Sequence, residues 1–270
     1  GDQVAKILLV GIDGLNLNTA LESGLAPNLK SLHKKGFFTW LETSVPTLSG
    51  PSWSTLLTGA TYSEHQVSDN LFLNHELNSF PDFLSLAAHK NSEIKTFAAA
   101  GWPPLIDPAG IGPVIRQRVE DQHRGHHRLV VRDGETYGYI KIDAEIANFS
   151  NYYINRHGPH ASFVYFCDVD DAGHIYGSEH EEYLSAIGRV DSYLGRLLMS
   201  VKERVEQHNE EWIVAVVTDH GHKPEGGHGG DSPAERQSFL MARGLGRKNP
   251  EWNEKIEPFH VAKLLLQELN

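Results

Sequence analysis

The chain has 270 residues, a formal net charge of −11 at pH 7 and a hydrophobic fraction of 40%. That length and composition are enough for a folded domain with a sizeable core. The acidic balance argues against a nucleic-acid scaffold that works by neutralising phosphates, but one small anionic substrate stays compatible if bound cations reverse the local field. The single cysteine, Cys167, excludes an internal disulfide and a thiolate-rich metal site. No apolar run reaches the length of a membrane span.

No stretch resembles a linker and no internal repeat is present, so we expect a single catalytic domain over residues 1–270. The chain begins with Gly1 rather than an initiator Met. This start favours an exported or periplasmic protein from which a signal peptide has been removed. The sequence does not define an oligomeric state.

Apolar runs that suit strands alternate along the chain with segments of helical character. The expected strands cover residues 6–10, 37–44, 94–99, 162–166, 212–217 and, as a late edge strand, 238–242. The expected helices cover residues 27–35, 51–59, 81–90, 143–156, 181–205 and 258–269. Unbroken apolar strands separated by helices predict an α/β fold, in which a mostly parallel central sheet carries helices on both faces.

The segment 101–136 fits this alternation poorly. It contains Trp102, two neighbouring prolines, several glycines and a basic patch at 123–128. A long irregular insertion in a compact domain is often a lid or a substrate loop. We therefore expect this segment to be irregular and to act as a lid or substrate loop, with a plain surface excursion as the alternative.

Three of the strand candidates end in residue types that bind metals. Asp13 follows the first strand, the acidic run 168–171 follows 162–166, and the pair Asp219-His220 follows 212–217. A further histidine, His228, lies in the glycine-rich stretch 226–230. Ligands gather at the carboxyl ends of parallel strands, and carboxylate and imidazole groups bind zinc where cysteine is absent. The sequence thus predicts a binuclear metal site at one edge of the sheet.

The candidate ligands divide into two sets. The first set is Asp170, His174 and His228, and the second is Asp13, Asp219, His220 and the hydroxyl oxygen of Ser49. Taken singly, Asp13 suits a turn and Ser49 suits a helix cap. Their common position at strand ends favours metal binding instead, and two cations about 4 Å apart suit in-line displacement at phosphorus.

The order of these motifs resembles the alkaline phosphatase superfamily, and within it the type I phosphodiesterase and nucleotide pyrophosphatase branch. The resemblance rests on the segments 12–14, 46–51, 58–59, 65–70, 170–174, 218–221 and 227–229. It extends from about residue 6 to about residue 230 and does not cover 101–136.

The resemblance implies two zinc ions, or other divalent ions, held by the two sets above. It implies that Ser49 attacks phosphorus to give a phosphoseryl intermediate, at a position where the branch usually has Thr. Asn70 would donate to a phosphoryl oxygen. The N–H of Gly50, near a helix N-terminus, would do the same, and Trp102 is a candidate for stacking on a substrate base.

The expected function is metal-dependent hydrolysis of a small phosphorylated substrate, at a phosphodiester or pyrophosphate bond. A phosphomonoesterase is the first alternative, since Arg124 or Arg128 of the 101–136 segment could supply the extra positive charge that a monoester needs. A sulfatase is the second, although Trp53 stands where its motif requires Arg. A non-catalytic metal-binding module is the third, but it would have no use for Ser49 and Asn70.

Overall fold

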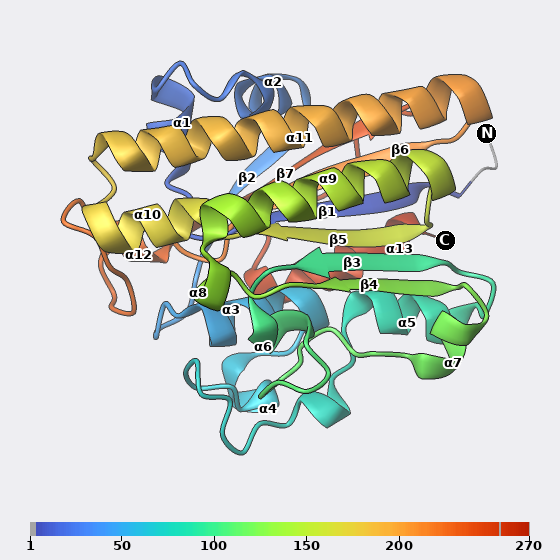
Figure 1. Cartoon of the computed structure of the whole chain (residues 1–270), viewed down its shortest axis with the longest axis horizontal. Coiled ribbons are helices and arrows are strands. Elements are labelled where there is room, and N and C mark those ends of the chain that lie inside the picture. The colour runs from blue at the N-terminus through green and yellow to red at the C-terminus, as the bar shows by residue number, and fades with distance from the viewer. Residues whose placement is uncertain (1–3, 254, 270) are drawn as a thin grey trace.

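The computed structural model describes residues 4–253 and 255–269. Within them, seven strands form one sheet in the order β2-β7-β6-β1-β5-β3-β4 (Figure 1). The strands are β1 (Lys6–Ile12), β2 (Phe37–Glu42), β3 (Thr96–Ala100), β4 (His127–Val131), β5 (Ala161–Phe166), β6 (Trp212–Val217) and β7 (Gln237–Leu245). The central strand β1 pairs in parallel with β5 and β6, while β7 runs antiparallel to β6 and β2. The predicted α/β fold with a mostly parallel sheet is confirmed.

Helices cover both faces of the sheet (Figure 1). One face carries α3 (Ser49–Thr58), α5 (Phe83–Lys90), α6 (Pro103–Ile106) and α13 (Val261–Glu268). The other carries α1 (Leu17–Glu22), α2 (Pro27–Lys35), α9 (Tyr139–His157), α10 (Asp168–Tyr176) and α11 (Glu181–His208). The remaining short helices are α4 (Tyr62–His65), α7 (Val119–His123), α8 (Gly134–Tyr137), α12 (Pro233–Arg236), η1 (Leu77–Ser79) and η2 (Pro258–His260). Among the described residues, no helix is both long and apolar enough to cross a bilayer.

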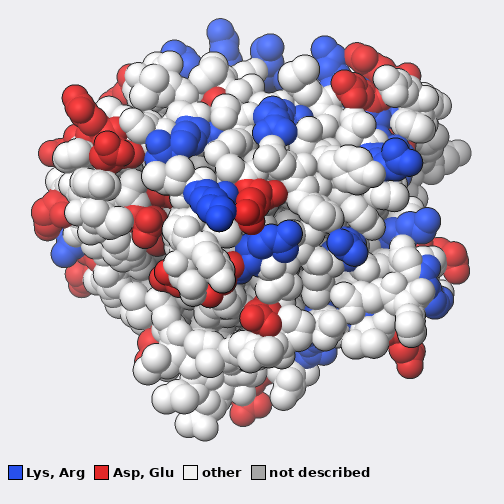
Figure 2. Space-filling view, viewed as in Figure 1, with Lys and Arg blue, Asp and Glu red and all other residues white. Residues whose placement is uncertain are grey.

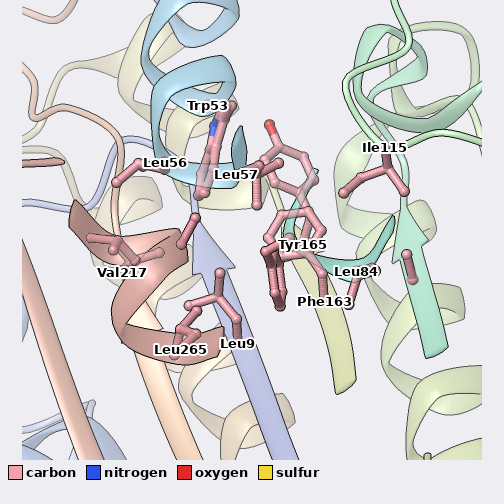
Figure 3. Packing of buried hydrophobic residues seen from close by; sticks show 14 of the residues in the cluster. Leu9, Trp53, Leu56, Leu57, Leu84, Ile115, Phe163, Tyr165, Val217 and Leu265 are labelled. Atoms are coloured by element: carbon pink, nitrogen blue, oxygen red, sulfur yellow. The ribbon is translucent and has the colours of Figure 1, made fainter. Parts of the chain in front are cut away.

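The strands β1, β5 and β6 are buried on both faces, because successive side chains point to opposite sides of a sheet that helices cover on both sides. On the face that carries α3 and α13, Phe163 of β5 packs against Trp53 of α3, and Leu9 of β1 lies beside Leu265 of α13 (Figure 3). The Trp53 ring centroid lies 5.8 Å from that of Phe163 and 5.4 Å from that of Tyr165. This packing holds the first turn of α3 over the carboxyl end of β1.

Two expectations about element position were wrong. The strand expected at the late edge, β7, lies between β2 and β6, and β2 is an edge strand. Residues 238–242 of β7 are fully buried, which fits a strand inside the sheet. The helix expected to begin near Pro51 begins at Ser49, so Ser49 belongs to its first turn rather than preceding it.

The 101–136 segment is more regular than expected. It contains α6, α7, most of α8 and the strand β4, which pairs in parallel with β3. Its basic patch lies at the amino end of β4, where Arg124 donates to the carbonyl of Ser92 and the Arg128 guanidinium lies 5.3 Å from the centre of the Phe149 ring. Neither arginine lines the cavity at the carboxyl ends of the strands.

The buried carboxylate of Asp143, on α9, caps α10 from outside that helix. It accepts hydrogen bonds from the backbone N–H groups of Cys167 (2.9 Å) and Asp168 (2.8 Å). We expect Asp143→Ala to lower the free energy of unfolding by roughly 2–4 kcal/mol, because two buried donors lose their acceptor. Denaturant unfolding of the metal-free protein measures this, and Asp143→Asn, which keeps one acceptor oxygen, should cost clearly less. Equal stability of Asp143→Ala and the wild type would contradict the capping role.

Two buried histidines make the fold sensitive to acid. His65 accepts a hydrogen bond from the N–H of Val67 and lies 2.9 Å from Thr55 Oγ1, and His127 Nδ1 lies 2.7 Å from Thr96 Oγ1. Burial lowers the pKa of both rings from about 6.5 to about 4. Between these values the unfolded chain binds more protons than the folded chain, so stability is intact above pH 6.5 and is lost as the pH falls toward 4.

We therefore expect the free energy of unfolding to fall by roughly 2–3 kcal/mol per histidine over that interval. Urea unfolding at a series of pH values measures the slope. The variant His65→Gln/His127→Gln should show a shallower slope, and an unchanged slope would assign the acid sensitivity to other groups.

Candidate metal centre and active site

Three adjacent strands bring the candidate ligands together. β6, β1 and β5 are neighbours in the sheet and run in parallel. Asp13 follows β1, Asp219 and His220 follow β6, and Asp170 and His174 lie on α10, which begins two residues after β5 ends. The carboxyl ends of parallel strands meet at one edge of a sheet, so residues more than 200 positions apart become neighbours.

The first cluster surrounds Ser49. Its Oγ lies 3.3 Å from Asp13 Oδ1 and 3.2 Å from His220 Nε2. His220 Nε2 in turn lies 3.2 Å from Asp13 Oδ1 and 3.2 Å from Asp219 Oδ2. Asp219 Oδ1 accepts the N–H of Gly14, but the buried Oδ2 has no hydrogen-bond partner in the described part of the chain. A buried carboxylate oxygen without a donor fits a cation ligand.

The second cluster surrounds Asp170. Its Oδ2 lies 3.4 Å from His174 Nε2, and its Oδ1 lies 3.7 Å from His228 Nε2 and 2.7 Å from His222 Nε2. The Nε2 atoms of His174 and His228 are 2.9 Å apart. Burial opposes ionisation of Asp170, yet the imidazoles of His174 and His222 hold its pKa well below the usual range. One ligand atom from each of these four residues lies within 4.8 Å of all the others.

Hydrogen bonds define which ring nitrogen faces the clusters. His220 Nδ1 lies 2.9 Å from the carbonyl of Gly221, and His228 Nδ1 contacts the carbonyl of Thr47. A carbonyl only accepts, so each Nδ1 carries a proton, and each Nε2 is the nitrogen that faces the carboxylates and can bind a cation once it is unprotonated. Such an outer carbonyl is the usual partner of a metal-bound histidine. This all-N/O donor set suits zinc and also admits other divalent cations.

The first cluster carries strong electrostatic coupling. Burial alone lowers the pKa of His220, but Asp219 and Asp13 outweigh it and raise the pKa to about 10. Burial and the neighbouring Asp13 carboxylate raise the pKa of Asp219 well above its usual range. Without a cation the ionised form of Asp219 is therefore disfavoured, and a divalent cation among these carboxylates would reverse that preference.

Several residues that sequence reasoning missed hold this arrangement. Trp53 Nε1 and the Tyr165 hydroxyl both donate to Asp13 Oδ2, at 2.9 and 2.6 Å. His222 lies beside Asp170 although we had assigned it no role. Its signal was present in the sequence, because it is a second histidine in the same short motif as Asp219 and His220. No comparable pattern marks Trp53 or Tyr165.

A cavity of about 360 Å³ opens over both clusters. Its lining residues are Asp13, Leu48, Ser49, Asn70, Trp102, Glu135, Tyr139, Tyr165, Cys167, Asp170, Asp171, His174 and His228. No Lys or Arg is among these described residues. On the molecular face drawn in Figure 2, Lys and Arg are interspersed with Asp and Glu. A cavity whose described lining contains several carboxylates but no Lys or Arg needs cations before it can hold a phosphate.

Asn70 and Gly50 contact one another at the cavity. The N–H of Gly50 donates to Asn70 Oδ1 at 2.7 Å, which leaves the amide Nδ2 for another acceptor. A Cβ at position 50 would lie 2.7 Å from the carbonyl oxygen of Asp69, so the close approach of this loop requires glycine. The Gly50 N–H could make the predicted contact with a substrate only if its hydrogen bond to Asn70 Oδ1 broke.

Comparison with known proteins places the chain in a family. The family model described as type I phosphodiesterase / nucleotide pyrophosphatase matches residues 7–235. GPI ethanolamine phosphate transferase 1 of Candida glabrata is 24% identical over 288 residues, covering 96% of this chain and 30% of the relative. Ectonucleotide pyrophosphatase/phosphodiesterase family member 7 of Rattus norvegicus is 25% identical over 229 residues, covering 81% of this chain and 50% of the relative. The chain thus spans half or less of the length of these relatives.

Solved structures share the fold. Murine ectonucleotide pyrophosphatase/phosphodiesterase 5, an inactive variant in complex with AMP, has a TM-score of 0.68 at 17% identity, with 98% of this chain and 95% of that chain covered. Phosphonoacetate hydrolase from Sinorhizobium meliloti 1021, in complex with phosphonoformate, has a TM-score of 0.70 at 13% identity, with 99% and 96% covered. The resemblance to the alkaline phosphatase superfamily is confirmed. Because the family model covers most of its length, the chain belongs to the type I phosphodiesterase / nucleotide pyrophosphatase family.

Proposed function

We propose that the chain hydrolyses phosphate esters, with phosphodiesters preferred, through Ser49 and two divalent cations, for which zinc is the expected metal. The position of the Ser49 hydroxyl carries this proposal. Its oxygen lies within 3.3 Å of both Asp13 Oδ1 and His220 Nε2 and faces the cavity that Asp170 and His174 also line. A metal-storage or structural site would have no use for a hydroxyl so placed.

The metal ligands, Ser49 and Asn70 would each have a separate role in the reaction. Cations held by the two ligand sets would act as Lewis acids, lowering the pKa of the Ser49 hydroxyl and stabilising the leaving oxygen. Ser49 Oγ bonds to phosphorus while the bond to the leaving oxygen breaks. The hydroxyl proton passes to Asp13 Oδ1, its hydrogen-bond acceptor, and from there to solvent, and the leaving oxygen takes up a proton from solvent to become the alcohol. Water then displaces Oγ from phosphorus and restores the serine. Asn70 Nδ2, oriented by the Gly50 N–H, donates to a phosphoryl oxygen.

The charge of the cavity wall favours diesters over monoesters and pyrophosphates. Beyond the ligand sets, the carboxylates of Glu135 and Asp171 line the cavity, and none of its described lining residues is Lys or Arg. A phosphodiester carries one negative charge, whereas a monoester dianion or a second phosphoryl group would add charge beside these carboxylates. The arginines considered for this purpose, Arg124 and Arg128, lie outside the cavity.

Turnover of chromogenic esters with and without a chelator tests the proposal. We expect bis(p-nitrophenyl) phosphate to be hydrolysed faster than p-nitrophenyl phosphate and p-nitrophenyl sulfate. A chelator should remove the activity and added zinc should restore it. Faster monoester hydrolysis would reverse the assigned preference, and no chelator-sensitive hydrolysis of any ester would favour a non-catalytic metal-binding module.

A second candidate is transfer of a phosphoethanolamine group, as in the names of several relatives. The observation that favours it is that Glu135, Asp171 and the indole of Trp102 line the same cavity as the candidate ligands. Carboxylates together with an aromatic face attract an ammonium group. The Tyr139 hydroxyl donates to Glu135 Oε1 at 3.0 Å and orients that carboxylate.

Short-chain phosphatidylethanolamine distinguishes transfer from hydrolysis. With an added sugar alcohol, phosphoethanolamine attached to that alcohol indicates transfer, and free phosphoethanolamine indicates hydrolysis. Glu135→Gln should raise the KM for this substrate several-fold while leaving bis(p-nitrophenyl) phosphate unaffected. No phosphoethanolamine in either form would remove this candidate and leave the diesterase proposal intact.

A further inference from the structure

His222 differs from His220 and His228 because its hydrogen bonds place the proton on the nitrogen that faces the cluster. Its side chain is fully buried, and its Nδ1 accepts the N–H of Gly227 at 3.2 Å. The accepting Nδ1 has no proton, so Nε2 carries it and donates to Asp170 Oδ1 at 2.7 Å. His220 and His228 show the opposite pattern, with Nδ1 bound to a carbonyl.

The ring of His222 sits between two glycines. A Cβ added to Gly173 would lie 2.9 Å from ring atoms Cε1 and Nε2, and one added to Gly14 would lie 2.8 Å from Nε2. The backbone is held as well, because the His222 N–H donates to Asn16 Oδ1 at 2.8 Å and Asn16 Nδ2 donates to the His222 carbonyl at 3.1 Å. These contacts restrict the ring to one position, against the turn of α10 that separates Asp170 from His174.

We propose that His222 is a positioning residue for the cation site of Asp170, His174 and His228, and not a ligand of it; this inference rests on the metal-dependent function proposed above. Its Nε2–H holds Asp170 Oδ1, which directs Oδ2 toward His174. Its Nδ1 holds the N–H of Gly227, in the loop that carries His228. One ring thus ties a ligand on α10 to a ligand on the loop after β6, and sets the distance between them before a cation binds.

Zinc affinity measured by chelator competition tests this role. His222→Leu, which keeps the bulk of the ring but removes both polar contacts, should weaken zinc at this position 10- to 100-fold, as loss of an outer hydrogen bond does. The other cation position should lose less affinity, about tenfold at most, because only Asp170 links it to His222. His222→Gln, whose amide N–H reaches the place of Nε2, should recover most of the affinity.

Gly173→Ala perturbs the same contact without removing a polar atom. The new methyl group would displace the ring, so zinc affinity should fall as it does in His222→Leu. Combining the two changes should cost little more than either alone, because both break one contact. Gly188→Ala is the matched control, since a Cβ there lies at ordinary distance, 3.8 Å, from Leu25.

The visible spectrum of the Co²⁺-substituted protein separates positioning from ligation. We expect His222→Gln to keep the wild-type bands, because its set of ligands is unchanged. Altered bands in that variant would make His222 a ligand and overturn the proposal, as would wild-type zinc affinity in both His222→Leu and Gly173→Ala. If the wild-type protein bound no zinc or Co²⁺ at all, the proposed function itself would fail, which is a different result.

Discussion

Ser49→Ala is expected to abolish phosphodiester hydrolysis while both cation positions stay filled. In hydrolases that use an activated serine as nucleophile, removing that serine lowers kcat by about 10⁴-fold or more. The carboxylates and imidazoles of the two ligand sets remain, and Asp219 Oδ2 is still without a hydrogen-bond donor among the described residues. Steady-state kinetics with bis(p-nitrophenyl) phosphate and metal analysis of the same sample measure both parts.

A matched control lies on the same helix. Ser52 is buried on α3, and its hydroxyl lies 3.0 Å from that of Tyr62, outside the cavity. Ser52→Ala should therefore keep activity within a few-fold of the wild type. A wild-type rate in Ser49→Ala would remove Ser49 as the nucleophile. Loss of both metals in that variant would instead mean that the hydroxyl contributes mainly to binding them.

Asp170→Asn is expected to weaken both cation positions at once. The carboxylate of Asp170 belongs to both groups of possible ligands, one with His174, His222 and His228 and the other with Asp13 and His220. Its Oδ1 lies 3.8 Å from His220 Nε2, which places it between the two clusters. The amide keeps the volume but removes the charge, so we expect a loss of zinc affinity of at least about 100-fold at each position, beyond what an outer contact costs.

His228→Ala provides the contrast to Asp170→Asn. His228 belongs to one of the two groups only, so this variant should empty one position and leave the other. Metal content after dialysis, measured by mass spectrometry, should therefore fall to about half for His228→Ala and close to zero for Asp170→Asn. Two retained ions in either variant would contradict the assignment of its ligand.

The arrangement of the sheet was predictable where the sequence pattern is strong. The strands that became β1, β5 and β6 are mainly apolar runs, and each is followed within two residues by an aspartate. The strand β4 was not predicted, because its run 127–131 begins with His and Arg and is partly exposed. The place of β7 inside the sheet was also missed, since an antiparallel partner arriving from the other side leaves no mark in the sequence.

What the sequence determined by itself is which residues end the buried strands, and hence that Asp13, Asp170 and Asp219 share one edge of a parallel sheet. Strand polarity and burial follow from local pattern, so that much can be read in order along the chain. Only the tertiary structure decided that His222 donates to Asp170 and that Asn70 engages the N–H of Gly50. Those contacts depend on distances of a few ångströms and on which ring or amide atom faces its partner, and both are set by packing between separate elements.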